Sequence, residues 1–112
     1  MQRDVMNYDV VIVGAGPSGL ASAIHLKQLC QQHNTELSIA VLDKGSSVGA
    51  HIISGCVMDP KALNELIPNW QELNFPAATK VTKESLFFLS EATNIKLPIP
   101  RDWKNTGNYI IS

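Results

Sequence analysis

Short apolar runs alternate with a longer amphipathic segment in the first part of the chain. Residues 8–13 ("YDVVIV") and 37–42 ("LSIAVL") are rich in apolar and β-branched residues, which is typical of strands buried on both faces of a parallel sheet. Between these runs, apolar residues recur at helical spacing as far as about residue 32. The order strand, helix, strand predicts a βαβ unit over residues 8–43.

A glycine-rich loop at residues 44–56 precedes a second helical pattern at about residues 59–70. Asp59 can cap this helix, and Pro60 suits its first position because a missing N–H costs nothing there. One apolar stripe runs along the predicted helix and consists of Leu63, Leu66, Ile67 and Trp70. Most such stripes pack against a domain core, and this interpretation needs no ligand or partner.

The last predicted element is a β-hairpin at about residues 81–100. The runs "VTKESLFFLS" and "IKLPIP" flank the polar turn "EATN". Pro98 and Pro100 cannot donate to a sheet ladder, so they confine the second strand to an edge. Together, the patterns predict an α/β fold.

The segment between the first strand and its helix reads "GAGPSG", residues 14–19. Gly14 permits a tight turn, Gly16 lets a pyrophosphate approach the backbone, and Gly19 lets the helix pack closely on the sheet. Pro17 fits the first helical turn. The N–H groups at the start of the helix, together with the positive end of its dipole, then face an anion.

A glycine-rich turn alone is weak evidence for a ligand, but here a carboxylate follows at the end of the next strand. Asp43 comes 24 positions after Gly19, near the ~20 expected for a residue that binds a ribose diol. Lys44 follows it and is more typical of surface solvation than of a contact with a 2′-phosphate. We therefore predict a dinucleotide site, and the motif by itself fits FAD and NAD equally.

Composition and charge exclude several other classes of function. The 112 residues are 45% hydrophobic with a formal net charge of −1, which fits one globular domain and gives no sign of a nucleic-acid surface. No apolar run reaches the ~18 residues of a membrane span, and we recognise no targeting peptide at the start. Cys30 and Cys56 lack the spacing of a zinc site or a disulfide framework, so we expect no metal site and a reduced compartment.

Four segments of the chain resemble one family, and together they extend over essentially all of its length. They are "VVIVGAGPSGLASAIHLKQL", "GAHIISGCVMDPKALNELIPNW", "FFLSEATNIKLPIP" and "NTGNYIIS", in this order. The chain resembles the N-terminal part of the electron transfer flavoprotein–ubiquinone oxidoreductase family. The second segment is far more specific than the glycine motif, which many flavoproteins share.

The resemblance implies the N-terminal part of a Rossmann-like FAD-binding domain, incomplete as given. FAD would be bound by the glycine loop and Asp43, and residues 49–55 ("GAHIISG") would run beside the cofactor. His51 in such a loop is more typical of a structural hydrogen bond than of catalysis, and we predict no catalytic residue. The predicted cofactor-binding residues are Val13, Gly14, Ala15, Gly16, Pro17, Ser18, Gly19, Asp43, Lys44, Gly49, Ala50, His51, Ser54 and Gly55.

The resemblance also implies a function and partners. Electrons from reduced electron transfer flavoprotein would reach ubiquinone through FAD and a 4Fe-4S cluster, whose cysteines we expect in a missing C-terminal part. The chain alone would then be inactive. In this family the segment corresponding to residues 59–70 belongs to an apolar surface that dips into one membrane leaflet, so we expect peripheral attachment to the inner face of a bacterial cytoplasmic membrane.

Two alternatives stay open at this point. Another FAD-dependent oxidoreductase, of the isoprenoid-chain reductase or aromatic hydroxylase type, would open with similar motifs. A truncated, non-catalytic nucleotide-binding module would carry the same loop without turnover.

Overall fold

The computed structural model describes residues 4–73 and 78–112, and the chain divides into two compact units. The first unit comprises Met1–Ile53 and the second Ser54–Ser112. The sequence predicted a single partial domain, and the boundary falls within its predicted glycine-rich loop at residues 44–56.

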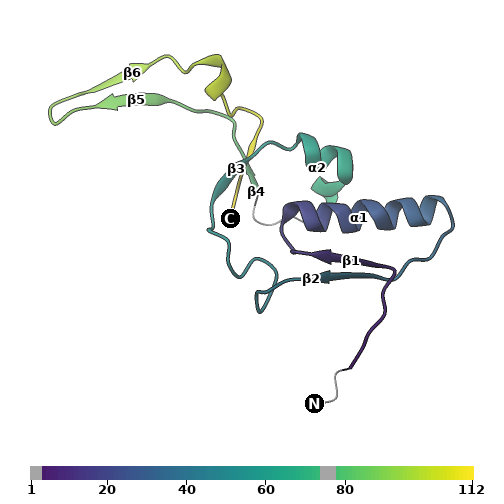
Figure 1. Ribbon diagram of the computed structural model, residues 1–112. Coiled ribbons are helices and arrows are strands. Elements are labelled where there is room, and N and C mark those ends of the chain that lie inside the picture. Colours follow the sequence, from purple (N-terminus) through teal and green to yellow (C-terminus); the bar gives the residue numbers. More distant parts are fainter. Residues whose placement is uncertain (1–3, 74–77) are drawn as a thin grey trace. The chain divides into compact units, whose positions relative to one another are not determined.

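The first unit is a βαβ unit. Strand β1 (Val10–Val13) leads into helix α1 (Pro17–Gln32), which returns the chain to strand β2 (Ile39–Leu42). The two strands pair in parallel, from Val10 opposite Ile39 to Val13 opposite Leu42. Helix α1 lies along one face of this pair (Figure 1). The predicted α/β arrangement of this segment is confirmed.

Both strands are shorter than predicted, and side-chain hydrogen bonds between Asp9 and Ser38 supplement the backbone bonds just ahead of them. The Asp9 carboxylate accepts the N–H of Ser38 at 2.8 Å and the Ser38 hydroxyl at 2.6 Å. In return, the Asp9 N–H donates to the Ser38 hydroxyl oxygen at 3.0 Å. These bonds join the two segments that immediately precede β1 and β2. The hydrogen bond from the Ser38 hydroxyl is the main cause that lowers the pKa of Asp9.

The second unit contains a small antiparallel sheet that the sequence did not predict. Its order is β3 (Cys56–Met58), β7 (Tyr109–Ile111) and β4 (Ala78–Lys80), with β7 in the middle. Two short 3₁₀ helices, Trp70–Glu72 and Arg101–Trp103, also belong to this unit.

The helix predicted over about residues 59–70 is wrong in length. Helix α2 spans only Lys61–Leu66. Asp59 supports its start, since a carboxylate oxygen accepts the Lys61 N–H at 2.9 Å. The helix ends because Ile67 precedes Pro68, whose ring disfavours helical conformation in the residue before it; Ile67 has φ −133° and ψ 83°.

The predicted hairpin is confirmed in its central part. Strand β5 (Leu86–Leu89) pairs antiparallel with β6 (Asn94–Leu97), and the Ser90 N–H closes the turn on the Thr93 carbonyl at 2.9 Å. Its predicted ends at 81 and 100 are wrong. Val81 instead donates its N–H to the Asn108 carbonyl, and β6 stops before Pro98.

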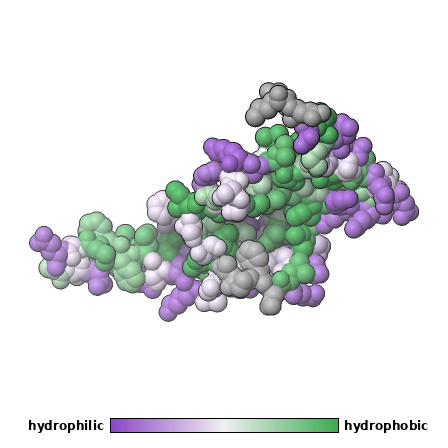
Figure 2. Space-filling view, turned by 90° about the horizontal axis from the view of Figure 1, so that it is seen from below, coloured by the Kyte–Doolittle hydropathy of each residue, from purple (hydrophilic) through white to green (hydrophobic). Residues whose placement is uncertain are grey.

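Large apolar side chains are exposed over much of the chain. Among the described residues, the buried hydrophobic ones are Ala15, Cys30 and Trp70. On the hairpin, Phe88 is 61% exposed and Leu89 is 73% exposed. Figure 2 shows this hydrophobic surface (green) along the hairpin, behind a hydrophilic tip (purple).

Candidate functional site

The glycine loop begins with a turn that only glycine adopts without strain. Gly14 has φ +104°, in the left-handed region that L side chains rarely enter. Its N–H donates to the Leu42 carbonyl at 2.6 Å, which extends the parallel ladder one step beyond Val13. The chain therefore leaves β1 still attached to the end of β2.

The other two glycines of the motif differ in what a side chain would meet. A Cβ on Gly19 would collide with the Gly14 carbonyl oxygen, and it would also lie 3.4 Å from Ile12 Cγ2 on β1. Gly16 has an ordinary extended conformation (φ −78°, ψ 179°), and a Cβ there would have no atom within 4 Å. The fold thus requires Gly14 and Gly19, whereas at Gly16 it leaves open space beside the backbone.

The start of α1 presents unpaired N–H groups next to that space. Pro17 is the first helical residue, as predicted, and the first bond of the helix runs from the Leu20 N–H to the Gly16 carbonyl at 3.0 Å. The N–H groups of Ser18 and Gly19 precede this bond and have no intrahelical acceptor. The first turn of α1, which lies wholly in the described residues, contains no acidic side chain that would compete for these donors.

Asp43 connects the end of β2 to this loop. One carboxylate oxygen accepts the Ala15 N–H at 2.9 Å, and the other accepts the Gly45 N–H at 2.7 Å. These bonds, that of Ala15 first, lower the pKa of Asp43 below its ordinary value of 3.8, and the charge of His51 acts in the same direction. The ionised Asp43 carboxylate is therefore held in place directly beside the glycine loop.

The remaining predicted site residues of the first unit are exposed. Val13 ends β1 with 85% of its surface exposed, and Lys44 is also exposed. Gly49, Ala50 and His51 lie in consecutive turns, closed by the Ala50 N–H to Ser47 O and the Ile52 N–H to Gly49 O. These positions fit a ligand-lining role, which stays a prediction.

Ser54 and Gly55 belong to the second unit. Their predicted contact with the cofactor stays a prediction. The Ser54 hydroxyl lies 2.7 Å from the Ser112 hydroxyl within that unit.

Gly45 was absent from the predicted site, although it holds Asp43 in place. A Cβ on Gly45 would lie 3.0 Å from the Asp43 oxygen and 3.1 Å from the Ser47 carbonyl oxygen, so the turn is too tight for a larger residue to fit without displacement. The signal for it was present as "DKG", in which an aspartate can accept the N–H two residues later.

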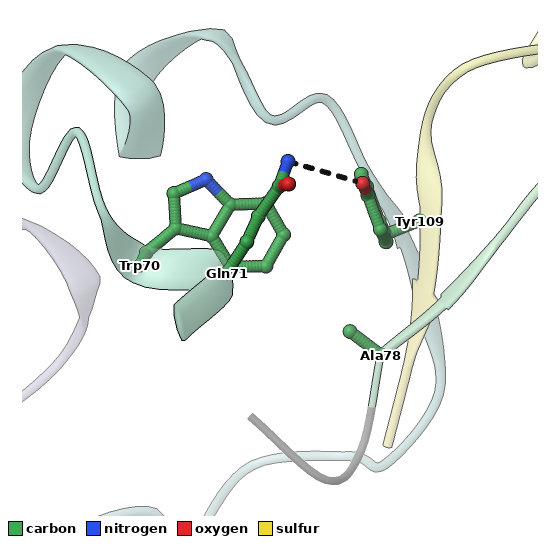
Figure 3. A pocket seen from close by; sticks show the side chains of 4 residues that line it. All are labelled: Trp70, Gln71, Ala78 and Tyr109. Carbon is green, nitrogen blue, oxygen red and sulfur yellow. Dashed lines mark hydrogen bonds between the residues drawn. The ribbon is translucent and has the colours of Figure 1, made fainter. Parts of the chain in front are cut away.

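A separate small pocket of about 180 Å³ lies in the second unit between Trp70, Gln71, Ala78 and Tyr109 (Figure 3). The Trp70 and Tyr109 rings meet edge to face at 5.0 Å, and the Gln71 amide donates to the Tyr109 hydroxyl at 3.4 Å. Ligand pockets usually exceed ~300 Å³. The pocket's polar groups also satisfy one another, so we assign it a packing role.

Trp70 anchors this packing. It is only 4% exposed, and its indole N–H donates to the Asn64 side-chain oxygen at 2.7 Å. Leu63, Leu66 and Ile67 are half-buried, while Lys61 and Glu65 are exposed. The apolar stripe predicted for this segment is thus buried at Trp70 and partly exposed at its other three positions.

Comparison with known families agrees with this geometry. A family model described as an NAD(P)-binding Rossmann-like domain matches residues 12–71, slightly more than half of the chain. The chain belongs to this Rossmann-like family. The α/β class predicted from the sequence is thereby confirmed.

Curated relatives confirm the resemblance found in the sequence. The chain is 56% identical over 110 residues to electron transfer flavoprotein-ubiquinone oxidoreductase, mitochondrial, of Dictyostelium discoideum, which covers 98% of the chain and 18% of the relative. It is 52% identical to the mitochondrial protein of that name from Oryza sativa subsp. japonica, over 98% of the chain and 19% of the relative. The Pseudomonas aeruginosa protein of that name is 50% identical over 100% of the chain and 21% of its own length. The chain thus spans about a fifth of the length of these relatives.

Neither a membrane-spanning helix nor a metal-binding cluster occurs in the part of the chain that the structure describes. Within residues 4–73 and 78–112, no helix combines the length and the apolar character needed to cross a bilayer. The same part of the chain contains no cluster of three or more His, Cys, Asp or Glu side chains arranged to hold a metal ion.

We expect Gly16→Val and Gly19→Ala to fail in different ways. Gly16→Val should keep the fold, losing about 1 kcal/mol through a poorer helix cap, and should lose nucleotide because its side chain fills the approach to the backbone. Gly19→Ala should lower the free energy of unfolding by about 3 kcal/mol, because its Cβ meets the Gly14 carbonyl. Chemical unfolding and equilibrium dialysis with ADP separate the two effects, and a Gly16→Val protein that still binds ADP would contradict the assignment.

The lowered pKa of Asp43 predicts how the loop responds to acid. Since the folded pKa lies below the unfolded one, the carboxylate stabilises the fold above about pH 4, and this contribution is lost as pH falls through the folded value. The amide resonances of Ala15 and Gly45 should therefore hold constant down to about pH 4 and shift only below it. Asp43→Asn should abolish this titration, and Asp9→Asn should leave it intact. A shift of the two amide resonances centred well above pH 4 would contradict the lowered pKa of Asp43.

Proposed function

We propose that this chain is the N-terminal, FAD-binding part of an enzyme that passes electrons from reduced electron transfer flavoprotein to ubiquinone. The observation that carries the proposal is the open space at Gly16, beside unpaired helix N–H groups and the Asp43 carboxylate. The fold gives no internal reason for a glycine at this position, and a pyrophosphate gives an external one. The relatives that bear this enzyme's name support the choice of reaction.

The residues present suit a dinucleotide such as FAD. The N–H groups of Ser18 and Gly19 would hold the pyrophosphate, with the positive end of the α1 dipole behind them. The Asp43 carboxylate would accept hydrogen bonds from the two hydroxyls of the ribose. The family model is described by NAD(P) binding, so a nicotinamide dinucleotide is the second candidate, and FAD is favoured by the resemblance of residues 49–70 to flavoproteins.

When bound, FAD would supply the electron-transfer chemistry, and this chain would supply binding and orientation. The described residues contain no group for which we propose acid–base or nucleophilic catalysis. The 4Fe-4S cluster, the ubiquinone site and the contact with electron transfer flavoprotein would belong to the full-length protein. A different FAD-dependent oxidoreductase and a non-catalytic nucleotide-binding module remain the alternatives.

We further propose that the full-length protein attaches peripherally to a membrane through the segment 59–70. Trp70 is buried, so it is unsuited as the anchor; Leu63 and Leu66 are only half-buried and can supply apolar area. The exposed Lys61 can extend its amine toward lipid headgroups. A bacterial cytoplasmic membrane is the proposed site.

The reaction is tested on the natural full-length polypeptide that carries this sequence. We expect it to purify with a flavin absorbance spectrum, to be reduced by reduced electron transfer flavoprotein, and to reduce a soluble ubiquinone analogue. Gly16→Val should abolish all three. Bound nicotinamide in place of flavin, or a flavin that electron transfer flavoprotein leaves oxidised, would overturn the proposal in favour of one of the alternatives.

The membrane contact is tested with Leu66→Asp in the same polypeptide. If the segment lies in the membrane interface, the variant should stay folded and keep its flavin, but sediment less with vesicles of anionic lipid because apolar area is lost. Asn69→Asp adds the same charge at an exposed site without losing apolar area, and should bind vesicles like the wild type. Unfolding or loss of flavin in Leu66→Asp would instead show that the stripe serves only the core.

A further inference from the structure

We propose that Asp43 is a positioning residue, which holds the glycine loop in its nucleotide-binding conformation before any nucleotide arrives. This role rests on the proposed nucleotide-binding function, and it is distinct from a direct contact between Asp43 and the ribose. The two roles involve different atoms and predict different consequences when the carboxylate is removed.

Two successive N–H groups of the loop bond to two successive residues at the end of β2. The Gly14 N–H donates to the Leu42 carbonyl at 2.6 Å, and the Ala15 N–H donates to the Asp43 carboxylate at 2.9 Å. The side chain of Asp43 thus extends the parallel ladder of β1 and β2 by one further bond. The loop cannot leave this position without breaking both bonds.

The surroundings of Ala15 explain why its bond to Asp43 matters for the position of the loop. The residue is only 7% exposed and its bond to the exposed Asp43 carboxylate is partly buried, so loss of the carboxylate leaves the Ala15 N–H with limited access to water as another acceptor. A partly buried donor that loses its acceptor is disfavoured, and without Asp43 the loop would relieve this by moving. The open conformation at Gly16, where the phosphate would lie, belongs to the position that the bond maintains.

The carboxylate is itself held from its other side. Its second oxygen accepts the Gly45 N–H at 2.7 Å, in a tight turn where a Cβ at position 45 would lie 3.0 Å from that carboxylate. A carboxylate has about four acceptor positions on its two oxygens. One on each oxygen is used by the loop and the turn, which leaves one on each for the two hydroxyls of a ribose. Positioning and ribose binding are therefore compatible.

A loop that is positioned in advance affects every ligand that needs it. Apparent affinity falls in proportion to the fraction of molecules in the competent conformation. If Asp43 acts through the loop, removing it should weaken ligands without a ribose diol as well as ligands with one. If it acts only on the diol, ligands that lack the diol should be indifferent to it.

The test is a comparison of ADP with 2′,3′-dideoxy-ADP on the cofactor-stripped natural full-length polypeptide. By calorimetry, Asp43→Ala should weaken dideoxy-ADP binding roughly tenfold, and ADP binding further because the diol contact is also lost. Asp9→Ala is the matched control, because Asp9 joins the same two strands at their opposite ends. It should leave both affinities unchanged.

Amide hydrogen exchange in the nucleotide-free protein gives an independent measure. Exchange of the Ala15 amide should accelerate in Asp43→Ala and stay unchanged in Asp9→Ala. If Asp43→Ala does not fold, Asp43→Asn, which retains one acceptor oxygen, should show the same changes with smaller size. Equal dideoxy-ADP affinity with and without the carboxylate would overturn the positioning role while the proposed function stands. A wild-type protein that binds neither nucleotide would overturn the proposed function, and the positioning role with it.

Discussion

The bond from the Ala15 N–H to the Asp43 carboxylate ties the glycine loop to the strand on which the first unit is built. A loop that follows a parallel strand must turn away sharply, and its N–H groups then lose their partners in the ladder. Here Gly14 turns with positive φ and still reaches the Leu42 carbonyl. The next N–H belongs to the buried residue Ala15, and the carboxylate that follows β2 accepts its hydrogen bond.

The fixed loop in turn determines where α1 begins and how close it comes to the strands. The carbonyl of Gly14 lies where a Cβ of Gly19 would be, so the first helical turn rests directly on the loop. Two of the three motif glycines are thus explained by folding alone. The third, Gly16, has ordinary backbone angles and free space, and this contrast separates a requirement of the fold from a requirement of a ligand.

The βαβ unit could be predicted because two short apolar runs, a glycine motif and a carboxylate all indicate the same structure. The strands β3, β4 and β7 could not, since three residues are too few to display a period of two. The end of α2 was predictable in principle from Pro68, but the apolar stripe that continues to Trp70 outweighed it. The bond between Ala15 and Asp43 depends on tertiary geometry, and the sequence only indicated that a carboxylate follows the second strand.

The two units differ in how far their apolar and polar groups find partners within the described residues. The hairpin register places Phe88 and Ile95 on one face and Phe87 and Leu89 on the other, and all four are 48–73% exposed. A lone two-stranded hairpin is at best marginally stable in water. The relatives are about five times as long as this chain, so in such a protein most of the material that can cover these faces lies outside the 112 residues. The glycine loop differs, because its ties to Leu42, Asp43 and Gly45 close within the first unit. The geometry of the loop is therefore determined within the first unit, whereas the exposed faces of the hairpin have no such cover among the described residues.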